Sequence, residues 1–146
     1  MKRFFIFLTI IAFMSAGCKT HKDSIVNAMP AFNSEDVWQL ATMQGKEVAF
    51  LEGQKKISIQ INTEAGTFSG SSGCNRYFGS FKDLGDGKML LADINGTKMA
   101  CPEAFHKMEN SYMQLLRRCD AYRLNEYSLD LMQGDKVLLS FDKVKQ

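Results

Sequence analysis

The sequence has little of what marks several large classes of protein. It carries only two histidines, no internal repeat and no low-complexity segment. It has no block of like charge, so the clustered Lys and Arg of a nucleic-acid-binding surface are missing, and we expect no nucleic-acid partner. No apolar run reaches the about twenty residues that a membrane-spanning helix needs. What remains is a chain of ordinary single-domain size.

The first seventeen residues have the layout of a secretory signal segment. Two basic residues come first, an apolar stretch of roughly thirteen residues follows, and Ser15-Ala16-Gly17 precede Cys18. Small residues before a cysteine resemble a bacterial lipobox, although Ser15 stands where Leu is usual. In that pattern the thiol takes a diacylglycerol and the chain is cut just before it. The alternatives are ordinary signal-peptidase cleavage, which Met14 and Ala16 fit poorly, and an incidental cysteine.

We therefore expect residues 1–17 to be a lipoprotein signal peptide, residues 18–34 a lipidated tether and residues 35–146 the folded domain. The lipid on Cys18 would anchor the protein to a membrane of the cell envelope, and we expect the outer membrane, on its periplasmic or surface side. Removal of residues 1–17 takes away two basic residues and no acidic one. The mature chain then has 16 of each and is formally neutral.

From Val37 onward the chain consists mostly of short runs with strand-like patterns. Ile57 to Asn62 alternates apolar and polar residues, which indicates a half-buried strand. Gly79 interrupts another such run and favours a bulge. Further strands are expected over these ranges: 37–40, 48–51, 67–70, 76–82, 88–94, 121–124, 128–132 and 137–144.

One segment, Pro102 to Arg118, has the period of a helix instead. Its apolar residues Phe105, Met108, Tyr112 and Leu115 recur at spacings of three and four. The expected fold is α+β and mainly β: a curled antiparallel sheet or half-open β-barrel of about eight strands. The one helix is inserted before the last three strands.

Three clusters in this order resemble the META domain, the HslJ-like family of small bacterial envelope proteins. The first is Val37-Trp38-Gln39-Leu40. The second is the run from Phe68 to Gly79, and the third begins at Thr97. The residues that match the family pattern are Trp38, Gly73, Cys74, Asn75, Arg76, Gly79, Thr97, Met99, Cys101 and Pro102.

The resemblance implies a non-catalytic, barrel-like domain of a lipoprotein or secreted protein linked to heat stress, drug tolerance or virulence. We accordingly expect a stress-associated binding or assembly module of the bacterial cell envelope, with another envelope protein as its partner. The alternative is a carrier of a small hydrophobic ligand, in the manner of lipocalins.

Four cysteines are present, and if Cys18 carries lipid, three pairings remain open among Cys74, Cys101 and Cys119. Cys74 and Cys101 lie in the two best-matched clusters, so we expect a disulfide between them. Such a crosslink would stabilise the fold by roughly 3–4 kcal/mol on the entropic model. The alternative is a pair of buried thiols. Cys119 is expected to be a core residue rather than a reactive thiol.

Neither catalysis nor metal binding is expected, and no cofactor is implied. A cysteine nucleophile needs a base within hydrogen-bond reach. His21 lies in the tether, and His106 is five residues from Cys101 on a different face of the expected helix. Cys101, Glu103, His106 and Glu109 match no spacing with four convergent metal ligands.

Overall fold

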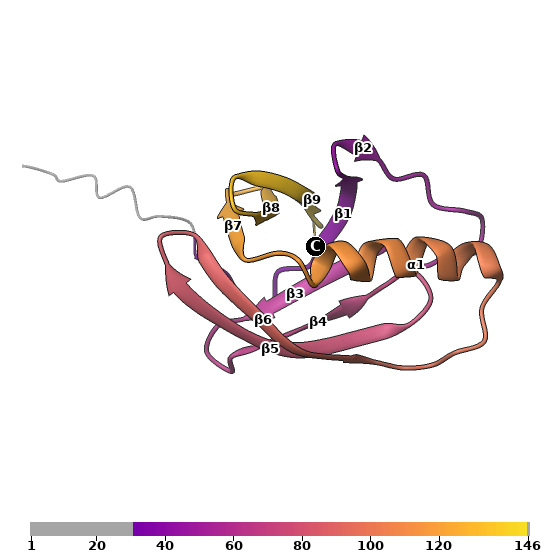
Figure 1. Cartoon of the computed structure of the whole chain (residues 1–146), viewed down its shortest axis with the longest axis horizontal. Coiled ribbons are helices and arrows are strands. Elements are labelled where there is room, and N and C mark those ends of the chain that lie inside the picture. Colours follow the sequence, from indigo (N-terminus) through magenta and orange to yellow (C-terminus); the bar gives the residue numbers. More distant parts are fainter. Residues whose placement is uncertain (1–30, 146) are drawn as a thin grey trace, which may run out of the picture.

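A computed structural model describes residues 31–145, which form nine strands and one helix (Figure 1). The expected signal peptide, the lipidation site Cys18 and most of the expected tether lie outside the described residues. No helix in the described part of the chain is long and apolar enough to span a membrane.

The strands and the helix follow one another with short connections. In chain order they are β1 (Trp38–Met43), β2 (Lys46–Glu47), β3 (Ser58–Asn62), β4 (Thr67–Ser71), β5 (Arg76–Gly85), β6 (Lys88–Gly96), α1 (Glu103–Leu116), β7 (Ala121–Leu124), β8 (Ser128–Gln133) and β9 (Lys136–Lys143).

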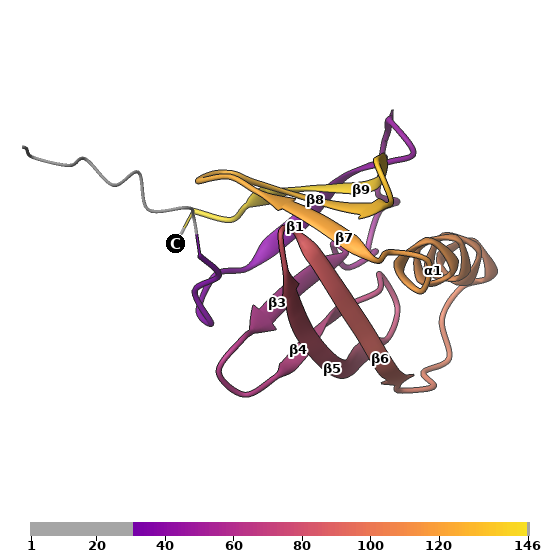
Figure 2. The same ribbon diagram turned by 60° about the vertical axis from the view of Figure 1, so that its left-hand side comes forward.

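All strand pairings within the described residues are antiparallel, and the sheet closes into a ring because β1 also pairs with β9. The ring has one weak seam: β6 and β7 share the single pair Lys88 and Ala121. Figure 2 shows the ring with α1 packed beside it. The expected fold is therefore confirmed: a mainly β, antiparallel sheet of nine strands, eight of which (β1 and β3 to β9) form the ring while β2 pairs only with β1, with the helix before the last three strands.

Strand alternation fills the interior of the ring. In β3, Ile59 and Ile61 point inward and are fully buried, while their polar neighbours lie on the outer face. The helix adds Tyr112 and Leu116, which are both 0% exposed. The largest fully buried side chains of the core are Trp38, Tyr77, Tyr112, Phe68 and Phe141.

Several element boundaries differ from the sequence-based expectation, and two of the differences have a local cause. The run Val48 to Leu51 is not a strand, because the side chain of Gln54 accepts a hydrogen bond from the Leu51 backbone N at 3.0 Å and holds a turn there. The helix is shorter at both ends than the expected range. Pro102 precedes its first turn with an extended ψ of 145°, and Arg117 caps its last turn.

Candidate functional site

A buried loop, residues 72–75, connects β4 to β5 and forms the centre of the site. Its four residues are all buried. Gly73 has a φ of +96°, a conformation that residues with side chains rarely adopt. A Cβ at this position would also meet Gln54 Nε2 at 3.0 Å. The glycine therefore allows the tight turn that presents the next two residues, Cys74 and Asn75, to the helix.

Cys74 and Cys101 form a disulfide that ties this loop to the segment before α1. The two residues are 27 positions apart, and their Cα atoms lie 6.2 Å from each other. Cys74 is only 4% exposed, whereas Cys101 is partly exposed. The crosslink joins the start of β5 to the start of the helix, so the position of α1 relative to the sheet is fixed covalently.

Glu109 is a buried carboxylate that receives hydrogen bonds from the loop. Ser72 Oγ and the Asn75 backbone N donate to Oε1, and Asn75 Nδ2 donates to Oε2 at 2.9 Å. Burial by itself raises the pKa of Glu109, but the hydrogen bonds from Ser72, Asn75 and His106 outweigh it and leave the pKa below its ordinary value. The carboxylate is therefore held in its charged form.

Asn75 joins this carboxylate to the segment that follows β6. Its Oδ1 accepts hydrogen bonds from Thr97 Oγ1 at 3.0 Å and from the Met99 backbone N at 2.7 Å. Thr97 Oγ1 in turn accepts from the Arg76 backbone N at 3.1 Å. Four residues of the family pattern, Asn75, Arg76, Thr97 and Met99, are thus linked by hydrogen bonds that centre on the Asn75 side chain. The Asn75 side chain therefore links the β4–β5 loop, the helix and the segment after β6.

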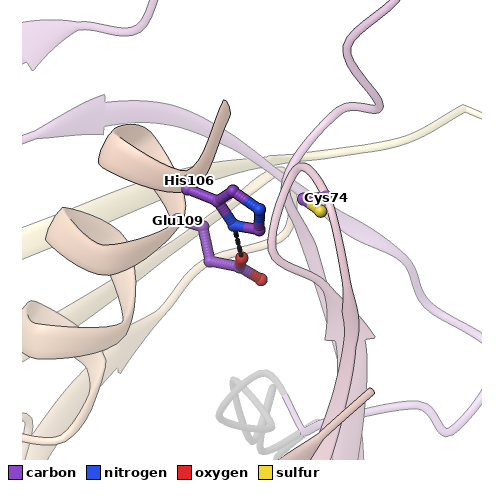
Figure 3. Close-up of side chains that lie close together, drawn as sticks. All are labelled: Cys74, His106 and Glu109. Atoms are coloured by element: carbon purple, nitrogen blue, oxygen red, sulfur yellow. Dashed lines mark hydrogen bonds and ion pairs between the residues drawn. The ribbon is translucent and has the colours of Figure 1, made fainter. Parts of the chain in front are cut away.

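His106 lies one helical turn before Glu109, and its Nδ1 is 3.3 Å from Glu109 Oε2. Figure 3 shows the imidazole ring beside the carboxylate, with its other edge turned toward Cys74. One ligand atom from each of Cys74, His106 and Glu109 lies within 4.8 Å of the other two. The sequence spacing did not reveal the proximity of His106 to Cys74, because Cys74 comes from a distant part of the chain, the loop between β4 and β5.

Two other residues of the family pattern serve packing. Trp38 is buried at the start of β1, with the ammonium of Lys143 5.6 Å from the centre of its ring. Gly79 lies where the β5–β6 register shifts, and a Cβ there would stand 2.6 Å from the Ala92 carbonyl oxygen. Within the described residues, neither Trp38 nor Gly79 forms a hydrogen bond with the polar cluster around Glu109.

Cys119 lies outside the site, after the end of α1. It is 6% exposed, and its Sγ is 3.3 Å from the Leu115 carbonyl oxygen. Burial, together with the charge of Asp120, raises the pKa of its thiol to about 12, although Arg118 acts in the opposite direction. The thiol is therefore protonated and shielded.

The outer face of β3, β4 and β5 carries a shallow hollow of about 370 Å³. Across the three strands, Ser58, Ser71 and Arg76 form one row, and Gln60, Ser69 and Phe78 form the next. Arg76 carries the one charge among the residues that line the hollow. Phe78 is 54% exposed, so a large apolar ring stands among hydroxyl and amide groups.

Comparisons with known proteins agree with this architecture. Residues 32–146 match the family model described as META domain. A protein from Burkholderia xenovorans, solved by NMR, is similar, with 28% identity over 86% of this chain and 98% of that one, and a TM-score of 0.60.

Two more distant structures share the fold. A second protein solved by NMR is 23% identical over 74% of this chain and 89% of its own, with a TM-score of 0.55. A crystal structure of a DUF4847 family protein from Bacteroides vulgatus has 19% identity over 77% of this chain and 95% of its own, with a TM-score of 0.51. No curated protein matches the sequence.

Proposed function

Since the chain belongs to the META domain family, we propose that it is a non-catalytic binding module of the bacterial cell envelope. In this proposal the lipid on Cys18 holds the module at the outer membrane, and the outer face of β3 to β5 contacts another envelope protein during assembly or under stress. The observation that carries the proposal is the contrast between a filled interior and an exposed aromatic residue in the hollow of that face.

The filled interior favours binding on the outside of the ring. Large aromatic residues from opposite sides of the core touch one another there: the ring centres of Tyr77 and Tyr112 are 5.7 Å apart, and those of Tyr112 and Phe141 are 6.4 Å apart. A lipocalin-like carrier needs space at that position for its ligand. The packing therefore gives the carrier alternative less support than a surface-binding module.

The outer face has the composition of a protein-binding surface. Aromatic residues, phenylalanine included, and arginine are enriched at protein interfaces. Phe78 and Arg76 supply both within one hollow, and the neighbouring serines and Gln60 offer hydrogen bonds without strong charge. Because the sheet holds all these residues in register, the surface is formed before a partner arrives.

The polar cluster around Glu109 is better suited to holding the fold than to catalysis. The carboxylate of Glu109 already accepts hydrogen bonds from Ser72 and Asn75, and Cys74 is joined to Cys101. A base or nucleophile with free capacity would be needed for turnover. Because Glu109 and Cys74 are already bonded to other residues, the cluster supports the proposed non-catalytic role.

A site-specific photo-crosslinking experiment tests the proposed surface. Benzoyl-phenylalanine is placed at position 78 in the membrane-anchored protein, and the matched control carries it at Tyr127, which is another exposed aromatic residue (65%) outside the hollow. We expect a discrete adduct with one envelope protein from position 78 and none from position 127. Equal adducts from both positions, or none from position 78, would contradict the proposed surface.

The anchor is tested separately with Cys18→Ala. We expect the mass of the wild-type chain to include the acyl chains at residue 18, and Cys18→Ala, which keeps its uncut signal segment, to carry none. A wild-type chain without that added mass would show that the thiol carries no lipid anchor, whatever the result at position 78.

A further inference from the structure

Cys74, His106 and Glu109 form a cluster of potential metal ligands, and the sulfur of Cys74 is bonded to Cys101 in the oxidised protein. We propose that reduction of the Cys74–Cys101 disulfide converts the cluster into a zinc site. The two thiolates and His106 are its ligands, and Glu109 is the carboxylate that orients the imidazole. The inference is independent of the proposed binding surface, because none of these four residues lines the hollow on the outer face.

The donors are brought together by the fold rather than by sequence spacing. Cys74 comes from the β4–β5 loop, Cys101 from the segment before α1, and His106 from the first half of the helix. Cys74 Sγ lies within 4.8 Å of a ring nitrogen of His106 (Figure 3). Two thiolates and one imidazole form a ligand set that binds zinc and leaves a fourth position for water.

The backbone already has the spacing that two zinc-bound cysteines require. Zn–S bonds of about 2.3 Å place two sulfurs about 3.8 Å apart on a tetrahedral ion. The Cα atoms of Cys74 and Cys101 are 6.2 Å apart, and rotation about the Cα–Cβ bonds alone can separate the sulfurs that far. The loop and the helix therefore need no large displacement.

Glu109 supplies the feature that distinguishes a built site from a chance group of donors. A metal-binding histidine commonly donates its other ring N–H to a carboxylate, which fixes its tautomer and orientation. His106 Nδ1 faces Glu109 Oε2 at 3.3 Å, and the carboxylate is itself held by Ser72 and Asn75. The side chain of His106 is 40% exposed, so an ion has a path to the site.

The chemistry balances with a dithiol as reductant. The dithiol gives two electrons and two protons to the Cys74–Cys101 disulfide and becomes a disulfide itself, which leaves two thiols. Zn²⁺ then displaces one proton from each thiol, and both protons pass to the solvent. A disulfide oxidant reverses the sequence: it takes two electrons from the two thiolates and two protons from the solvent, becomes a dithiol, and the ion is released.

Cobalt titration of the full mature chain tests the inference. The lipidated protein in detergent is reduced with a phosphine, freed of reductant under argon and titrated with Co²⁺, which occupies zinc sites and absorbs strongly when bound by thiolates. We expect one Co²⁺ per reduced chain with sulfur-to-cobalt absorption, and no such absorption from the oxidised chain. His106→Ala should weaken binding at least about tenfold, and Glu109→Gln by about 10–100-fold.

Two controls separate this site from non-specific thiol binding. Cys119→Ser removes the third thiol, which lies outside the cluster, and should leave the titration unchanged. Zn²⁺ should also raise the melting temperature of the reduced wild-type chain, because an ion that binds the folded state stabilises it. The inference is overturned if thiolate absorption is missing in the reduced wild type, persists in Cys101→Ser, depends on Cys119, or occurs without a rise in melting temperature.

Discussion

The hydroxyl groups of Tyr77 and Tyr112 lie 2.5 Å apart in the centre of the core. Tyr77 comes from β5 and Tyr112 from α1, so this contact links the helix to the sheet in addition to the Cys74–Cys101 disulfide. The Tyr77 hydroxyl also donates to the Ser58 carbonyl oxygen at 2.9 Å. The phenol of Tyr77 therefore connects three elements, β3, β5 and α1, inside the core.

The two tyrosines should respond unequally to loss of the hydroxyl. Tyr77→Phe removes the donor to Ser58 and leaves the Tyr112 hydroxyl buried without its partner, so we expect a loss of about 2–3 kcal/mol in the free energy of unfolding. Tyr112→Phe leaves Tyr77 bonded to Ser58 and should cost about 1 kcal/mol. Urea unfolding of both variants and of the double variant measures the difference. Equal losses would show that the Ser58 bond contributes nothing.

Truncation of Glu109 should be among the most destabilising single changes in the domain. Glu109→Ala leaves the Asn75 backbone N and Asn75 Nδ2 without an acceptor in a buried loop, and each unpaired donor costs about 1–3 kcal/mol. We expect a loss of at least about 3 kcal/mol by chemical denaturation. Glu103→Ala is the matched control on the same helix: its side chain is 83% exposed and pairs with Lys107, so its effect should stay within about 0.5 kcal/mol.

Acid should weaken the fold through Glu109. The pKa of its carboxyl is lowered in the folded protein from an ordinary value of 4.5. The unfolded chain therefore binds a proton more readily, and the contribution of Glu109 is complete above about pH 4.5 and is lost as the pH falls through the folded-state pKa. Unfolding free energies measured from pH 7 to pH 3 should fall more steeply for the wild type than for Glu109→Gln. Parallel curves would assign the acid sensitivity to other carboxylates.

Cys119 should not react with thiol reagents in the folded protein. Its burial and a pKa of about 12 leave almost no thiolate at pH 8. In a soluble form that begins at residue 19, we expect no alkylation by iodoacetamide under native conditions and one alkylated thiol after unfolding without reductant. Intact-mass spectrometry counts the adducts. Three adducts after unfolding would mean that Cys74 and Cys101 are not paired.

Local patterns in the sequence were sufficient for most of the fold. The alternation from Ile57 to Asn62 predicted β3 because only one face of that strand meets the core, and the spacing of Phe105, Met108, Tyr112 and Leu115 predicted α1 for the same reason. The closure of the ring could not be predicted from such local patterns. The pairing of β1 with β9 joins Trp38 to Lys143, and no local pattern encodes a contact between residues so far apart.

The candidate site shows the same limit more sharply. Asn75, Cys74 and Cys101 were identified through the family pattern, but Ser72 and the pair of His106 and Glu109 were not recognised as their partners. His106 and Glu109 are three residues apart on α1, a spacing that places them on one face of a helix. That signal was present in the sequence. The identity of the loop that faces them depends on how α1 packs against the sheet.

The pairing of β1 with β9 has a consequence for how the protein is made. The ring cannot close until residues 136–143 have left the ribosome, so the first strand has no partner on that side for most of synthesis. Pairings between distant segments also form slowly. A chain built in this way stays open while it is still being produced, and in the envelope location that we propose an open chain is the form that can be threaded through an export channel before it acquires its final shape.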